Sequence, residues 1–372
     1  MTISLPLDYG RMQRPEDKRS IDLADNPVQA ALAVYRQWLP LVPEDADVLE
    51  HNEETFFREA EALLKPHHEL LQKATNKDLN DIIASISIGP HAGYIASAVH
   101  NASGVETLEG VFSECDNIGY GLEAGKKVVL LPGSRAFSAG TRSRGTVINY
   151  GELTFLGIGA EGGCCVNYGT AINLGRLAEG MLMNFGHANF FGERAKNAAL
   201  LNFGRADFFQ GFTSSIAANL HYAAAFGTAA DDSIAFNLHI AQKMGKGAAE
   251  SVFVNSGRIA YTMGINGPSN VNVNAGSCLL SFNSFIAAQG NRINERSKPY
   301  RKIFVKMIAN AMPVTINRQN ARAEDLVSAF AALYRLRELM PDKEAVIEEA
   351  QKINWQEISS GARKIAEELK VE

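Results

Sequence analysis

The stretch LLNFGRADFFQGFTSSIAANLHYAAAFGTAADDSIAFNLHIAQKMG, residues 200–245, contains one short pattern three times. In each copy two apolar residues precede an Asn, Ala follows four positions later, and Phe or Met follows after seven. The same Asn recurs every 17 or 18 residues across the middle of the chain. The anchors are Asn149, Asn167, Asn184, Asn202, Asn219, Asn237 and Asn255, with Asn272 as a slightly early eighth. A period of this size indicates stacked structural units.

Glycine follows the pattern at two places in each unit. The first lies two residues after the Asn in five units, and the second comes after the apolar residue that ends the unit. Because glycine adopts positive φ at little cost, we expect the backbone to turn at both places. The first-place glycines are Gly151, Gly169, Gly186, Gly204 and Gly257, and the second-place set includes Gly157, Gly175, Gly192, Gly227, Gly245 and Gly264.

These repeats predict a β-solenoid. About 18 residues is too short for a helical repeat, which needs about 33, and the leucine-rich pattern is missing. Stacked coils would bring equivalent Asn residues about 4.8 Å apart, where amide side chains satisfy one another as a ladder. The apolar pairs before each Asn, such as Val147-Ile148 and Phe253-Val254, would form stripes in the core. The alternative is a mostly helical fold in which Ala-rich units such as residues 216–230 are short helices.

Helical patterns flank the repeats. We predict a mainly β protein with a helical N-terminal domain over residues 1–95, a β-solenoid over 96–290, and a helical C-terminal cap over 291–372 that covers the open end. Asn26 and Pro27 open the first helix as N-cap and first helical residue. Residues 128–145 fit a first full coil with Leu131 at the Asn place, and 99–110 resemble a degenerate one.

The charge, the apolar runs and the cysteines of the sequence indicate the cellular compartment. The net charge is −5, with the acidic excess in the first third of the chain. The sequence has no apolar run of 18 residues and no signal-peptide core, so we expect a cytoplasmic protein without a membrane span. The four cysteines are too scattered for a disulfide framework, and the vicinal pair Cys164-Cys165 is expected to fill the core.

Two units replace the first-place glycine with histidine. His221 and His239 would lie on neighbouring coils at one corner, within reach of one metal ion or one substrate oxygen. His187 and Asp207 are candidates for the same side of the rod, and Asp231 and Asp232 are the other nearby carboxylates. If this corner needs positive φ, each Gly→His change lowers the stability by on the order of 1 kcal/mol. Two such changes would then indicate a functional role for the histidines. The competing interpretation is that one ring simply stacks on the other.

A run of bases marks the early coils and is the one plausible anion-binding patch on the body. Its members are Lys126, Lys127, Arg135, Arg142 and Arg144. A solvated face is the more common explanation of such a run.

The sequence contains no P-loop, HExxH or paired CxxC motif. The spaced glycines resemble those of the β-helix domain of glutamate synthase, which implies architecture and no function. We therefore expect a non-catalytic scaffold or binding protein that presents a solenoid face to a protein partner or to itself. The alternative is an enzyme or metal-dependent site on the solenoid face around His221 and His239. No cofactor follows from the sequence.

Overall fold

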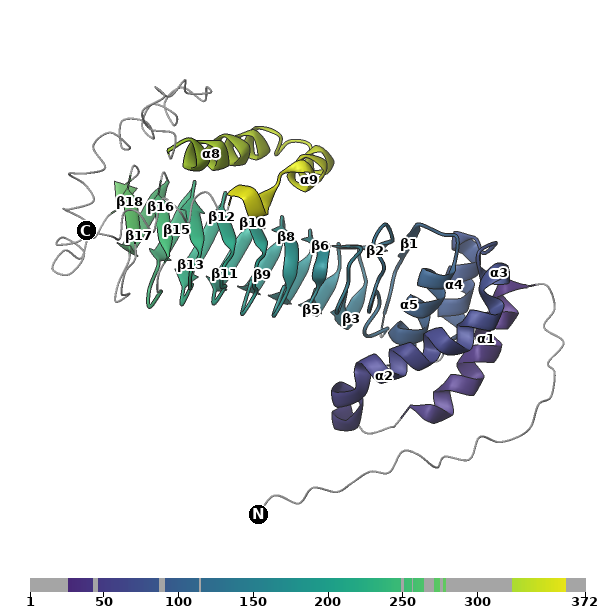
Figure 1. Ribbon diagram of the computed structural model, residues 1–372. Helices are drawn as coiled ribbons and strands as arrows, with labels where there is room; N and C mark the ends of the chain where they lie inside the picture. The colour runs from purple at the N-terminus through teal and green to yellow at the C-terminus, as the bar shows by residue number, and fades with distance from the viewer. Residues whose placement is uncertain are drawn as a thin grey trace, which may run out of the picture.

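The computed structural model shows a rod of stacked coils with helices at its N-terminal end and along one side (Figure 1). The residues that it describes are 26–42, 46–86, 91–113, 115–248, 251–255, 257–263, 271–274, 277–278 and 323–358. The predicted β-solenoid with helical flanks is confirmed.

The described residues that precede the coils form five α-helices. Asn26 caps the first by accepting a hydrogen bond from the Val28 amide, as predicted. The last helix is almost wholly buried and packs on the early coils, where a Cβ at Gly93 would lie 1.9 Å from the Asp116 carbonyl oxygen. Residues 99–102 belong to this helix, so they form no degenerate coil. The helices are α1 (Pro27–Trp38), α2 (Ala46–Leu64), α3 (His68–Leu71), α4 (Asn76–Ser85) and α5 (Ala92–Ala102), with 3-10 turns η2 (Leu39–Leu41) and η3 (Lys65–His67).

Each coil contributes one strand to each of two parallel sheets. In the ten-stranded sheet, every strand from β4 onward ends at an Asn. Its strands are β1 (Thr107–Gly110), β2 (Lys127–Leu130), β4 (Thr146–Asn149), β6 (Glu161–Asn167), β8 (Glu179–Asn184), β10 (Ala199–Asn202), β12 (Ile216–Asn219), β14 (Ile234–Asn237), β16 (Val252–Asn255) and β18 (Val271–Asn274). The nine-stranded sheet holds the other strands: β3 (Arg135–Ala139), β5 (Glu152–Leu156), β7 (Thr170–Leu174), β9 (His187–Phe191), β11 (Arg205–Gln210), β13 (Tyr222–Thr228), β15 (Ile240–Met244), β17 (Arg258–Met263) and β19 (Ser277–Cys278).

Residues 216–230 form β12 and β13, so the helical alternative is wrong for that segment.

The anchor asparagines form the predicted ladder. From Asn149 to Asn255 each Nδ2 donates to the Oδ1 of the next Asn at 2.8–2.9 Å, and all seven side chains are fully buried. Two register predictions at the ends are wrong. Asn255 pairs with Asn274 rather than Asn272, and Asn149 pairs with Leu130 rather than Leu131.

The apolar pair before each Asn divides between two cores. In β10, Leu200 points inside the coil while Leu201 points to the outer face, because successive side chains of a strand alternate. The expectation that both residues line the inner core is therefore half right. The outward row is buried against other side chains, and its members are Val129, Ile148, Val166, Met183, Leu201, Ala218, Phe236 and Val254.

That outward row lies under two C-terminal helices, α8 (Ala323–Glu338) and α9 (Lys343–Lys352). Leu333 and Val346 are fully buried in the contact. The helices run beside the ten-stranded sheet (Figure 1), so these described parts of the cap cover a face of the rod, whereas we expected them over its open end. The reason is that the outer apolar row needs burial as much as the end does.

The two glycine places have different physical roles. The second place takes positive φ, as at Gly175 with φ 75°, which confirms a turn that favours glycine. The first place does not. A Cβ at Gly169 would lie 2.0 Å from the Gly151 carbonyl oxygen of the preceding coil, so glycine there permits close stacking of coils.

No helix among the described residues is long and apolar enough to cross a membrane.

Candidate functional site

The structure brings His221 and His239 together at one corner of neighbouring coils. Their rings stack with centroids 5.4 Å apart and planes 6° from parallel. The Nδ1 of His239 lies 3.0 Å from the His221 carbonyl oxygen, a contact in which Nδ1–H donates. This leaves Nε2 as the nitrogen of His239 that is available to a ligand.

His187 and Asp207 form a separate site on the nine-stranded sheet. His187 Nε2 lies 3.1 Å from Asp207 Oδ2, and Arg205 Nε lies 2.9 Å from Asp207 Oδ1. Burial raises the pKa of Asp207, but the hydrogen bonds from His187 and Arg205 outweigh it and leave the pKa lowered. Asp207 is thus a charged partner of these two bases, and the register sets it two coils from His239.

No cluster of three or more metal-ligating side chains occurs in the part of the chain that the structure describes. Among the described residues, the metal hypothesis therefore rests on two histidines without a third ligand beside them. The strain argument for it also loses its basis, because the first glycine place does not take positive φ. Histidine at that corner needs no positive φ and so causes no backbone strain of that kind. It does replace a glycine that lets the coils approach closely.

Three of the five bases in the predicted anion patch have partners of their own. The Lys126 ammonium donates to the carbonyls of Ser103 and Val105, Arg135 pairs with Glu152 at 3.3 Å, and Arg142 pairs with Glu54. The patch stays a prediction that the structure does not support as one surface.

The cysteine pair behaves as filler of two different cores. Cys165 points into the coil and Cys164 points to the outer face, and both are free and buried. Burial raises the pKa of Cys164 to about 12, which leaves it a poor nucleophile at neutral pH. Cys278 has a strand assignment, but its side chain lies outside the described set.

The nine-stranded sheet exposes apolar side chains on its outer face. Phe137 is 56% exposed, Ile172 43% and Phe208 45%. Phe190 stacks on Phe208 at 5.2 Å, and Phe137 meets Phe155 edge-on at 5.1 Å. Sequence reasoning missed this surface because its residues sit in the same repeat as the core. The available signal was that they fall between the inward positions on each strand.

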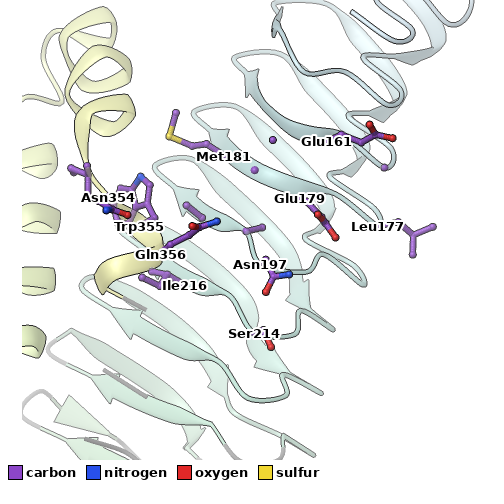
Figure 2. A pocket seen from close by; sticks show the side chains of 16 residues that line it. Glu161, Leu177, Glu179, Met181, Asn197, Ser214, Ile216, Asn354, Trp355 and Gln356 are labelled. Carbon is purple, nitrogen blue, oxygen red and sulfur yellow. The ribbon is translucent and has the colours of Figure 1, made fainter. Parts of the chain in front are cut away.

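A cleft of about 940 Å³ lies between the segment after α9 and the first residues of strands β6, β8, β10 and β12, together with the turns before them. Figure 2 shows Glu161, Glu179, Asn197 and Ser214 following one another across successive coils. Asn354, Trp355 and Gln356 enter from the opposite side on the C-terminal segment. The cleft was also missed, because its two walls are far apart in the sequence.

The C-terminal wall of the cleft is held in place by hydrogen bonds to backbone carbonyls and by packing. The indole Nε1 of Trp355 donates to the Ala350 carbonyl at 2.9 Å, which ties the wall to α9. Trp355 and Ile353 also pack against the outer core.

No family model, no curated protein and no solved structure matches this chain.

Proposed function

We propose that the chain is a non-catalytic scaffold or binding protein whose working surface is the outer face of the nine-stranded sheet. The observation that carries the proposal is that Phe137, Ile172 and Phe208 are exposed on three different strands of this one face. Large exposed apolar patches mark interaction sites in soluble proteins. The chain covers the corresponding surface of its other sheet with its own helices.

A second copy of the chain is the occupant that this face fits best. The face carries both signs of charge in close pairs, Arg135 with Glu152 and Arg205 with Asp207. Two such faces brought together meet no single-sign field that repels them. A twofold contact uses the same patch on both copies, and sheets stack face to face at about 10 Å.

Light scattering over a range of protein concentrations tests this occupant. We expect a dimer for the wild type and a monomer for the Phe137→Asp/Phe208→Asp double variant, because both changes put charge into the contact. Val111→Asp is the matched control, since Val111 is 58% exposed and lies outside the nine-stranded sheet. A wild-type chain that is monomeric at every concentration overturns self-association through this face.

The alternative of a metal-dependent site rests on the stacked pair His221 and His239. Metal analysis of the purified protein tests it, with the His221→Ala/His239→Ala double variant beside the wild type. Stoichiometric metal in the wild type that the double variant lacks would support the site. Equal metal content and equal ligand binding in the two proteins would make the pair structural.

A further inference from the structure

The cleft beside Trp355 has the lining of a binding site for a positively charged ligand. Its volume of about 940 Å³ lies in the range of small-molecule sites, about 300–1,000 Å³. Glu161 and Glu179 contribute two carboxylates, and among the described residues that line the cleft there is no Lys, Arg or His. The charged side chains that line the cleft are therefore both acidic.

The polar groups of the cleft are spaced by the solenoid itself. Glu161 and Glu179 are register partners on the neighbouring strands β6 and β8, which sets their backbones about 4.8 Å apart. Asn197 and Ser214 continue the same row over the next coils, and both carry oxygen acceptors. A row of acceptors at this rise matches a linear chain with several donor groups better than a compact ion.

The two carboxylates are not equivalent. Burial lowers the pKa of Arg142, but Tyr120, Glu54 and Glu161 raise it by more. The pKa of Arg142 is therefore raised overall. Glu161 therefore interacts electrostatically with Arg142, whereas Glu179 lies one coil further along the row. Arg144 lines a smaller adjoining cavity of about 240 Å³ that shares Trp355.

We propose that this cleft binds a linear organic cation, with its ammonium groups at Glu179 and Glu161 and its carbon chain against the indole of Trp355. Carboxylates supply charge-assisted acceptors for ammonium groups, and an indole adds cation–π attraction and apolar contact. The site lies on a different side of the coil from the exposed face of the nine-stranded sheet, so this inference does not rest on the proposed self-association.

Titration calorimetry with spermidine at low ionic strength tests the proposal. We expect saturable binding to the wild type that weakens in 0.3 M salt, because exposed charges are screened. Glu179→Gln should weaken binding about two- to fivefold and Glu161→Gln by less, since exposed ion pairs contribute little each. Glu348→Gln is the matched control, because Glu348 is exposed on α9 away from the cleft.

Tryptophan fluorescence locates the binding. The chain has two tryptophans, and Trp38 is buried among the N-terminal helices. A spermidine-dependent change that disappears in Trp355→Phe places the ligand in the cleft. Trp355→Phe keeps an aromatic ring for packing, and a circular dichroism spectrum equal to the wild type shows that it folds.

Three results would overturn the proposal. The first is no saturable spermidine binding up to about 10 mM, a weak limit for any specific site. The second is unchanged affinity in the Glu161→Gln/Glu179→Gln double variant. The third is equal binding of a neutral chain such as 1,8-octanediol, or of cellobiose, which would assign the cleft to uncharged ligands. Light scattering on the same variants separates these outcomes from a failure of self-association.

Discussion

The two sheets of this solenoid have the same coils and opposite outer faces. The ten-stranded sheet turns Val166, Leu201 and their neighbours outward and buries them under α8 and α9. The nine-stranded sheet turns Phe137, Ile172 and Phe208 outward and leaves them exposed. The comparison teaches that each coil has three destinations for an apolar side chain: inside, under a helix, or on an open surface. One period in the sequence describes all three.

The largest expected effect comes from breaking the covered face. Leu333→Asp places a charge at a fully buried position between α8 and the ten-stranded sheet. We expect a loss of about 3–5 kcal/mol in the stability of the packed helices, because a buried carboxylate there gains no partner. Dye binding to newly exposed apolar surface and faster proteolysis after α8 measure it. Equal dye binding to wild type and variant would contradict the covered-face description.

Acid should destabilise the N-terminal helical end of the molecule through His100, which lies on α5 and on neither sheet. Burial, together with the positive charge of Lys126, lowers the pKa of fully buried His100 from 6.5 to about 4. The unfolded chain then binds a proton that the folded chain does not, so stability falls as pH drops from 6.5 to 4. The loss reaches about 3 kcal/mol at pH 4, since each pKa unit is worth about 1.4 kcal/mol.

Denaturant melts of the wild type and His100→Leu across this pH range measure the effect. The variant should show a flatter pH dependence, because it lacks the titrating ring. An identical slope in both proteins would show that other groups carry the acid sensitivity.

The ladder tests what the two faces share. Asn202→Ala removes the acceptor of Asn184 and the donor to Asn219, which leaves buried polar groups without their partners. We expect a loss of about 2–4 kcal/mol in the free energy of unfolding, since each orphaned group costs about 1–3 kcal/mol. Asn189→Ala is the control within the preceding coil, because Asn189 is only partly buried on the open sheet. Similar melting temperatures for the two variants would argue against the ladder as a source of stability.

The smallest expected effect is on the open face. Phe208→Asp should lower the free energy of unfolding by only about 0.5–1 kcal/mol, because the side chain is 45% exposed and loses its stacking on Phe190. The contrast with Leu333→Asp, an apolar-to-Asp change on the other side of the rod, is the sharpest measure of the difference between the faces. Melts at low protein concentration keep self-association out of the comparison. A large loss for Phe208→Asp would mean that this face is part of the fold's own core.

The sequence predicted the solenoid because a buried Asn at one position is costly unless every coil repeats it. It predicted the start of α1 because Asn26 and Pro27 are local signals. It did not separate Leu200 from Leu201, since both are apolar and only the strand's alternation assigns them to different cores. The His221–His239 stack followed from the period alone. The cleft could not be predicted from the sequence, because Glu179 and Trp355 come together only through tertiary packing.

The asparagine ladder also makes the length of this rod a discrete quantity. Every amide donates in the same direction along the stack, so each coil both receives and passes on one hydrogen bond. Duplicating one complete coil would extend that chain of bonds without disturbing its neighbours. Inserting one residue into a strand would send every inward side chain outward. Such a rod therefore changes length in whole coils, and the size of one coil is the step of 17 or 18 residues between its asparagines.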